Sequence, residues 1–279
     1  MKELRDKVAV VIGGGSGVGR GIALACAEAG MRVVVADLHE ESATSVSDEL
    51  QAAGGRSLAV RADATDDASL EALADAAVRE FGGVHLLSNC AGVIQLVPAI
   101  EASDDDWHYI LEVNVMGTVK GVRVFAPRMI AQGEGHIVNT SSMAGLVADA
   151  VPMLSLYTAT KHAVLGLCDS LRGELEPQNV RVSCLCPGLV EGNLGTTSAR
   201  NRPDRFGGPG TPLTGGGEGL PQAMPAELCG KLVVAAVQAD RFLILTHPEA
   251  WPMLDKRVAR FRADFEAAER LKAEVTGGA

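Results

Sequence analysis

The sequence predicts an α/β fold in which a doubly wound parallel sheet of about seven strands carries helices on both faces. Short runs of Val, Leu and Ile alternate along the chain with longer helical patterns, which is typical of parallel strands buried on both faces. Right-handed crossovers then place helices on both sides of the sheet. A glycine-rich turn directly follows the first strand, so the fold is expected to be of the Rossmann type.

The predicted strands cover residues 8–12, 32–36, 57–61, 86–88, 136–139, 180–186 and 242–245. The predicted helices cover 20–29, 41–53, 68–81, 106–132, 157–176 and 226–239. With 279 residues the chain is long enough for one large domain, and two would be crowded. We therefore predict a single domain over 1–279, with a substrate loop at about 189–225 and a C-terminal helical extension at about 251–273.

Both of these segments depart from the strand–helix alternation. The segment 189–225 is rich in Gly and Pro without periodicity, and such long loops are usually lids or binding loops. In the tail, Leu254, Val258, Phe261 and Phe265 follow one another at spacings of four, three and four, which predicts one apolar stripe on a helix. This stripe is expected to pack against the chain's own body or against a sister subunit.

Charge and composition exclude several classes of protein. The net charge of −10 argues against nucleic-acid binding, which depends on clustered Lys and Arg. The apolar run after the charged N-terminus is too short for a signal peptide, and no stretch approaches a membrane span, so we expect a cytoplasmic protein. The six cysteines lack metal-ligand spacing and are interpreted as small buried apolar residues; no metal is expected.

The glycine-rich turn predicts a dinucleotide site. It reads Gly13-Gly14-Gly15-Ser16-Gly17-Val18-Gly19 and lies between the first strand and the first helix. Glycines at 13, 17 and 19 allow a tight turn and a close approach of the backbone to a pyrophosphate. The helix N-terminus supplies free N–H groups for the phosphates.

Asp37, at the end of the second strand, predicts NAD as the cofactor. A carboxylate about 20 residues beyond the glycines can bind both ribose hydroxyls and would repel a 2′-phosphate. The next residue, Leu38, is not basic, and Arg20 is the one nearby cation that could support NADP instead. Asp63, with Ala64 beside it, can reach the adenine edge, although capping the next turn explains Asp63 equally well.

Tyr157 and Lys161 are a candidate proton-transfer pair. Their spacing of four places both side chains on one face of a helix. A free tyrosine titrates near pH ~10, and a neighbouring ammonium favours the tyrosinate. The sequence therefore predicts a tyrosine whose pKa is lowered toward neutrality, where acid–base catalysis is most effective.

Over residues 6–246 the chain strongly resembles the short-chain dehydrogenase/reductase family, in its compact single-domain branch. The residues that carry the resemblance are Gly13, Gly17, Gly19, Asn89-Cys90-Ala91-Gly92, Asn114, Ser142, Tyr157, Lys161 and Pro187-Gly188. The resemblance implies a catalytic tetrad of Asn114, Ser142, Tyr157 and Lys161. It also implies that Asn89, Ala91 and Gly92 support the cofactor, that Lys161 and Tyr157 contact it, and that Asn114 holds a water linking Lys161 to solvent.

Four positions depart from the family pattern. Ile12 stands where Thr is usual, and Cys90 replaces an Asn. Ser142 lies about two residues further from Tyr157 than usual, which suggests an insertion near 148–152 and makes Ser141 a fallback for the serine role. Gly192 replaces a Thr that commonly holds the nicotinamide carboxamide, so Val190 or nearby backbone is expected to substitute beside Pro187-Gly188.

The resemblance implies an NAD(H)-dependent oxidoreductase that interconverts a secondary alcohol and a ketone. Val93, Ile94, Leu96, Val147 and Met153 suggest an apolar pocket for a bulky or aromatic substrate. The arginines Arg200, Arg202 and Arg205 leave an anionic substrate open, although solvated loop arginines explain them too. The tail from His247 onward also looks similar to members that act on bulky aromatic alcohols.

Three alternatives stay open. They are an NADPH-dependent ketone or 3-oxoacyl reductase of the same fold, a cofactor-using isomerase or dehydratase, and a non-catalytic dinucleotide sensor. The family also implies a homotetramer, or a homodimer, joined through the helices at 106–132 and 157–176.

Overall fold

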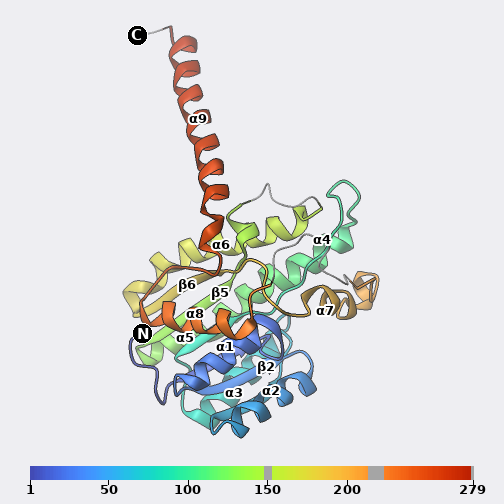
Figure 1. Ribbon diagram of the computed structural model, residues 1–279, viewed down its shortest axis with the longest axis vertical. Helices are drawn as coiled ribbons and strands as arrows, with labels where there is room; N and C mark the ends of the chain where they lie inside the picture. Colours follow the sequence, from blue (N-terminus) through green and yellow to red (C-terminus); the bar gives the residue numbers. More distant parts are fainter. Residues whose placement is uncertain (148–152, 213–222, 278–279) are drawn as a thin grey trace.

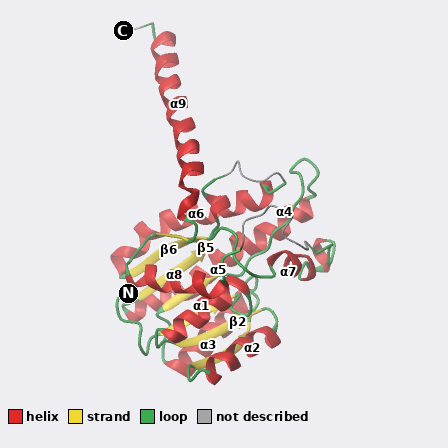
Figure 2. Cartoon of the chain, viewed as in Figure 1, coloured by secondary structure: helices red, strands yellow, loops and turns green. Residues whose placement is uncertain are grey.

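The computed structural model describes residues 1–147, 153–212 and 223–277. Its sheet contains seven parallel strands in the order β3-β2-β1-β4-β5-β6-β7. Figure 2 shows the strands in yellow, covered by helices. The strands are β1 Val8–Ile12, β2 Arg32–Asp37, β3 Arg56–Arg61, β4 Leu86–Asn89, β5 Gly135–Thr140, β6 Val180–Cys186 and β7 Leu243–Leu245. The predicted doubly wound parallel sheet is confirmed, and each predicted strand has its counterpart within two residues at either end.

The described α-helices are α1 Gly17–Glu28, α2 Glu40–Ala52, α3 Asp67–Phe81, α4 Asp104–Leu111, α5 Gly117–Gln132, α6 Ser155–Leu175, α7 Leu194–Arg200, α8 Ala226–Gln238 and α9 Trp251–Val275. A π-helical turn, Glu112–Met116, joins α4 to α5. Short 3₁₀ turns occupy Met143–Gly145, Glu176–Gln178, Asp204–Phe206 and Pro248–Ala250.

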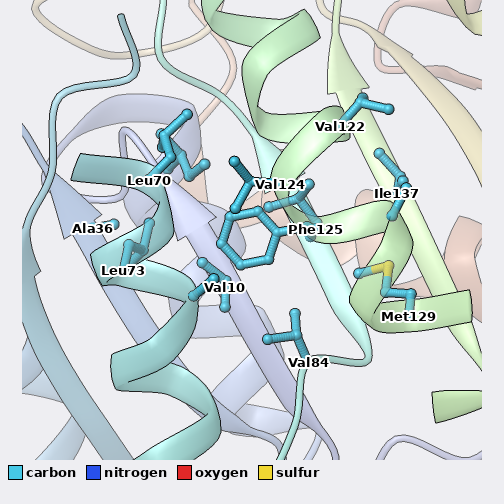
Figure 3. Close-up of a cluster of buried hydrophobic side chains, with 14 of the residues drawn as sticks. Val10, Ala36, Leu70, Leu73, Val84, Val122, Val124, Phe125, Met129 and Ile137 are labelled. Carbon is cyan, nitrogen blue, oxygen red and sulfur yellow. The ribbon is translucent and has the colours of Figure 1, made fainter. Parts of the chain in front are cut away.

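Two apolar cores lie on the two faces of the sheet. One contains side chains of α3, α5 and α6, and Figure 3 shows Phe125 and Met129 of α5 packed with Leu70 and Leu73 of α3 against Val10 of the sheet. The other contains side chains of α1, α2 and α8. Because alternate residues of each strand point to opposite faces, the strands need apolar residues at every position, which is why they read as continuous apolar runs.

The strand order reverses between β1 and β4. The chain builds β1, β2 and β3 outward in one direction and then returns to add β4 on the other side of β1. Loops that follow the carboxyl ends of β1 and β4 diverge at this point, and they leave the crevice in which open α/β sheets bind ligands.

Two expectations need correction. The helix predicted over 106–132 is divided by the π-helical turn into α4 and α5, because one extra residue is accommodated within that turn. The segment predicted as an aperiodic loop contains α7 and a bridge between Val190 and Met224. Helix α7 has only seven residues and includes Gly and two Thr, so no apolar period marks it; positions 213–222 lie outside the described residues.

Helix α9 extends the chain well away from the sheet and its covering helices (Figure 1). Its 25 residues begin at Trp251, as the apolar stripe predicts, and none of them is buried. Among the described residues, no helix is both long and apolar enough to span a bilayer.

Candidate active site

A cavity of about 790 Å³ opens at the carboxyl edge of the sheet, over the β1–β4 reversal. It brings together most of the predicted site residues, which lie far apart in the sequence. The predicted residues that line it are Gly13, Ser16, Gly17, Val18, Gly19, Asp37, Leu38, Asp63, Ala64, Ala91, Gly92, Ser142, Tyr157, Lys161, Pro187, Gly188 and Val190. Gly15, Asn89 and Asn114 do not line it.

The turn after β1 forms a cradle that only glycine permits. Gly13 has a φ of +80°, and a Cβ atom there would lie 2.6 Å from the amide nitrogen of Ala91. A Cβ atom on Gly19 would lie 2.0 Å from the carbonyl oxygen of Gly13. The N-terminus of α1 faces this turn, and the Ser16 side chain does not cap it. Free amide groups of α1 are therefore directed toward the cavity, as a pyrophosphate requires.

Asp37 ends β2 at the rim of the same cavity. Its Oδ2 accepts a hydrogen bond from the Gly15 amide at 3.0 Å, and its Oδ1 accepts one from the His39 amide at 3.1 Å. These bonds hold the carboxylate beside the glycine turn, although Gly15 itself lies outside the cavity lining. Each carboxylate oxygen can accept a further bond, so the group can still receive two hydroxyls.

Arg20 does not point a free charge into this end of the cavity. Its guanidinium donates to Glu49 at 2.6 Å and to Glu227 at 2.5 Å, and both are ion pairs. Hydrogen bonds to the two carboxylates raise the pKa of Arg20 above its ordinary value. Arg20, the residue predicted to be able to bind the 2′-phosphate of NADP, is thus already neutralised by two carboxylates.

Asp63 caps the turn that follows it. Its Oδ1 accepts hydrogen bonds from the Thr65 amide at 2.8 Å and from the Thr65 hydroxyl at 2.7 Å. The capping interpretation is therefore present in the structure, while Asp63 and Ala64 also line the cavity.

Tyr157 and Lys161, both on α6, lie at the other end of the cavity next to Ser142. The Lys161 ammonium lies 5.4 Å from the centre of the Tyr157 ring and donates to the Thr140 carbonyl at 2.9 Å. The Ser142 hydroxyl donates to the Pro187 carbonyl at 3.4 Å and lies close enough to Tyr157 to lower the pKa of that phenol. Ser142 follows β5 directly, so the end of that strand and the first turns of α6 build this group of three residues.

The pKa of Tyr157 differs from the expected value. Burial raises it to about 12, more than the nearby Ser142 hydroxyl lowers it. Burial also lowers the pKa of Lys161 to about 8. The ammonium faces the ring and the Thr140 carbonyl, and the same burial that separates both groups from water opposes charge on each of them.

Asn114 holds the framework behind this group. Its Oδ1 accepts from the Val93 amide at 2.7 Å, and its Nδ2 donates to the Val93 carbonyl at 2.9 Å and to the Thr160 hydroxyl at 3.0 Å. It therefore ties the loop after β4 to α6, from a position in the π-helical turn. Functional sites often contain such turns.

Asn89 belongs to the sheet and not to the cavity wall. Its amide donates to the Asn139 side chain at 2.8 Å, which joins β4 to β5. A Cβ atom on Gly121 of α5 would lie 2.2 Å from the Asn89 Oδ1 atom, so α5 packs directly on this amide. Asn89 therefore steadies the sheet behind the cavity, as the resemblance implies, and lies outside the cavity lining.

Ser142 and Ser141 have different surroundings. The Ser141 hydroxyl donates to the Lys161 carbonyl at 2.6 Å and is fully buried. The Ser142 hydroxyl accepts from the Ala144 amide at 3.1 Å and lies near Tyr157. The geometry favours Ser142 over the fallback. The insertion predicted near 148–152 lies outside the described residues.

Beyond Tyr157 the cavity wall is mainly apolar. Of the predicted pocket residues, Val93, Ile94, Leu96 and Val147 line it, but Met153 does not. Met153 is exposed at the end of the loop before α6. Apolar residues missed from the sequence include Tyr109, Val113, Leu154, Phe206 and Met253. They come from α4, the π-helical turn, the position before α6, the segment 189–212 and α9, and no local pattern indicates that these segments meet.

The three loop arginines do not act alike. Arg202 pairs with Asp106 at 2.6 Å, and Arg205 pairs with Glu112 at 2.9 Å. Arg200 is exposed and lines the cavity. Two of the three charges are thus neutralised by carboxylates of α4 and the π-helical turn, which explains them without an anionic substrate.

The cysteines and acidic residues form no evident metal centre in the described part of the chain. All six cysteines are free; five are buried, and Cys90 is half-buried at the cavity. Burial raises the pKa of the Cys90 thiol.

Comparison with known proteins agrees with this geometry. Residues 7–203 match the family model of the short chain dehydrogenases. A short-chain dehydrogenase/reductase from Burkholderia phymatum, solved in complex with NAD, superposes with a TM-score of 0.85 at 37% identity, over 95% of this chain and 97% of that one.

Two characterised relatives are dehydrogenases. The 1-deoxy-11-beta-hydroxypentalenate dehydrogenase of Streptomyces avermitilis is 34% identical, over 88% of this chain and 87% of its own length. The cyclohexanol dehydrogenase of Acinetobacter sp. (strain SE19) is 35% identical, over 68% and 75%. With a family match over most of its length and the same strand order, this chain belongs to the short-chain dehydrogenase/reductase family of oxidoreductases.

Proposed function

We propose that the chain is an NAD(H)-dependent dehydrogenase that interconverts a bulky, apolar secondary alcohol and its ketone. The observation that carries the proposal is one continuous cavity with Asp37 and the glycine turn at one end, Ser142, Tyr157 and Lys161 further along, and an apolar wall beyond them. The order of these groups matches the order in which a dinucleotide and an alcohol must meet.

The residues present fit a bound dinucleotide. A side chain on Gly13 or Gly19 would collide with the backbone of Ala91 or of Gly13, so glycine at both positions keeps the turn tight at the N-terminus of α1, where its free amides could bind a pyrophosphate. Asp37 would hold the adenosine ribose, and Asp63 and Ala64, which line the same cavity, would border the adenine. Pro187, Gly188 and Val190 would border the nicotinamide, and the relative from Burkholderia phymatum supports NAD as the dinucleotide. When bound, NAD accepts or supplies the hydride.

Tyr157 would act as the acid–base group. In oxidation its oxygen takes the proton of the substrate hydroxyl, and in reduction it returns that proton to the carbonyl oxygen. Ser142 would orient the substrate oxygen, since it lines the same cavity as Tyr157 and influences the pKa of that phenol. Lys161 would stabilise the tyrosinate and bind the nicotinamide ribose. Asn114 would act as a positioning residue that holds α6 against the loop after β4.

The apolar wall favours a bulky alcohol over a small sugar. Ile94, Leu96, Val147, Phe206 and Met253 surround the space beyond Tyr157, and burial of an apolar substrate there is favourable by about 25 cal/mol per Å². The two relatives named above are dehydrogenases of cyclohexanol and of 1-deoxy-11-beta-hydroxypentalenate, which supports an alcohol as the substrate.

An NADPH-dependent reductase of the same fold is the second candidate. The half-exposed guanidinium of Arg20 near the glycine turn is its one supporting feature, but that group is paired with Glu49 and Glu227. A non-catalytic sensor would leave the Ser142–Tyr157–Lys161 arrangement without a purpose. Assembly into a homotetramer through α5 and α6, and a cytoplasmic location, also remain predictions.

The decisive experiment measures NADH formation with a panel of secondary alcohols, each with NAD and with NADP. The proposal expects turnover of cyclic and aryl alcohols with NAD. Preference for NADP would instead identify the reductase. If binding of NAD is measurable by titration while every alcohol and the matching ketones stay unreacted, the sensor is the better description.

A further inference from the structure

Helix α9 carries an apolar stripe that the rest of its own chain does not cover. Phe265 is 77% exposed and Val275 86% exposed, and α9 stands away from the body toward its C-terminal end in Figure 1. Near its base, Arg257 donates to the Leu146 carbonyl and contacts the His162 ring, and this holds only the first turns of α9 to the body.

The stripe has a period of seven and not merely a helical one. It runs through Leu254, Val258, Phe261, Phe265, Ala268, Lys272 and Val275, with spacings that alternate between four and three; Lys272 is the one charged residue among them, and its methylene stem can pack as an apolar group. Such a repeat is the pattern by which two helices pack side by side in a coiled coil. A helix that packs on a globular body has a wider stripe.

We propose that α9 pairs with α9 of a second copy of this chain, in antiparallel orientation. In a symmetric pair of this kind, Val258 packs against Val275 of the second copy, Phe261 against the stem of Lys272, and Phe265 against Ala268. These three residue pairs all follow Arg257, the residue that contacts the body, along α9. The two bodies therefore sit at opposite ends of the helix pair.

The flanking charges select this orientation. In the antiparallel pair, Arg262 faces Glu269 of the second copy, and symmetry repeats this contact. In a parallel pair, Arg257 would face Arg262, and Asp264 would face Glu269, so both flanking contacts would be repulsive. Flanking charges of this type are known to set partner choice and orientation in coiled coils.

They also select the register. Sliding the antiparallel pair by one heptad toward the body would place Arg262 opposite Arg262 and Asp264 opposite Asp264. Sliding by a second heptad would bring opposite charges together again, but this register would require Leu254 in the interface between the helices and Arg257 as a flanking residue. Arg257 is already bound to the body, and Leu254 is half-buried at the base of the helix. The register through Phe265 and Ala268 is therefore the one that is both attractive and accessible.

The first test uses the full chain with Phe265→Glu, examined by sedimentation velocity over a series of protein concentrations. A buried unpaired carboxylate at the Phe265–Ala268 contact should weaken self-association by at least ~100-fold. If the wild type is a larger oligomer, the variant should have half as many subunits. Arg270→Glu, on the opposite face of α9, should associate as the wild type does. At a protein concentration at which the wild type is dissociated, both variants should melt at the wild-type temperature, because no residue of α9 is buried in the chain itself.

The second test distinguishes orientation. Arg262→Glu and Glu269→Arg should each weaken association by about tenfold, and the double variant should recover it. A parallel pair demands the opposite, since each single change would remove a repulsion and tighten association. Unchanged association of Phe265→Glu would overturn the pairing itself. Single variants that weaken association without recovery in the double variant would overturn the antiparallel register. Neither result depends on enzymatic activity.

Discussion

The guanidinium of Arg202 donates to the carboxylate of Asp106 at 2.6 Å and thereby ties the segment that covers the cavity to the start of α4. Each side chain is only 17% exposed, so the pair is better shielded than an ordinary surface ion pair. Although burial raises the pKa of Asp106, hydrogen bonds from Ser103 and Arg202 outweigh it and lower that pKa. Nearby, Tyr109 donates to the Ser198 carbonyl at 2.9 Å, so α7 is held at a second point.

Removal of the Arg202–Asp106 ion pair should make the segment 190–212 more mobile without altering Tyr157 and Lys161. For Arg202→Gln we expect the KM for the alcohol to rise by about three- to tenfold with a smaller change in kcat, as an ion pair of this burial contributes about 1 kcal/mol. Limited proteolysis should cut the segment 190–212 faster. Lys231→Gln, which removes an exposed ion pair with Glu28 on the far side of the sheet, should behave as the wild type. Equal KM values for the two variants would argue against this role of the Arg202–Asp106 ion pair.

Tyr157→Phe should reduce kcat by about 10²- to 10⁴-fold, because it removes the proton acceptor while leaving the ring in place. The affinity for NAD, measured by titration, should change little. Tyr109→Phe is the matched control, since it removes a buried tyrosine hydroxyl that contacts only the Ser198 carbonyl. That control should shift KM more than kcat. Wild-type turnover in Tyr157→Phe would show that another group carries the proton.

Asp37→Asn should reduce the preference for NAD over NADP. A charged acceptor for a hydroxyl contributes about 1.5–3 kcal/mol, so kcat/KM with NAD should fall by about 10- to 100-fold. Loss of the negative charge should at the same time improve kcat/KM with NADP. Asp63→Asn is the comparison, because its carboxylate is engaged by Thr65. A cofactor ratio that is the same in wild type and Asp37→Asn would place the ribose elsewhere.

His136 should make the protein sensitive to acid. Its ring is fully buried in β5, and burial is the main reason that its pKa falls to about 3. The unfolded chain therefore binds a proton near pH ~6.5 that the folded chain does not accept. The free energy of unfolding should fall as pH decreases from about 6.5 toward 3, by up to several kcal/mol.

His136→Gln tests this contribution. The histidine Nε2 contacts the Ser183 hydroxyl at 2.7 Å, and that hydroxyl donates to the Arg241 carbonyl, so a glutamine amide can supply the same donor. Urea unfolding at pH 7 and at pH 4.5 should show a smaller difference in this variant than in wild type. The exposed His108→Gln should retain the wild-type difference. An unchanged pH dependence in His136→Gln would assign the acid sensitivity to other groups.

Much of the fold follows from patterns that are local in the sequence. Continuous apolar runs predict strands that are buried on both faces, and the glycines after Ile12 predict the turn into α1. Asp37 is found by its place at a strand end, and Tyr157 and Lys161 by their spacing on a helix. These patterns suffice because backbone periodicity and turn geometry depend on residues within a few positions of one another.

Contacts between distant segments have no such signature. The sheet and the glycine turn could be predicted from the amino-acid sequence, and so could the sheet-supporting role of Asn89. The contribution of Met253 and Phe206 to the apolar wall, in place of Met153, became visible only when the chain was folded. The same is true of the ion pairs of Arg20 and Arg202, and of the burial that raises the pKa of Tyr157. Burial, ion pairing and desolvation depend on which distant segments meet at the edge of the sheet, and no local pattern encodes those contacts.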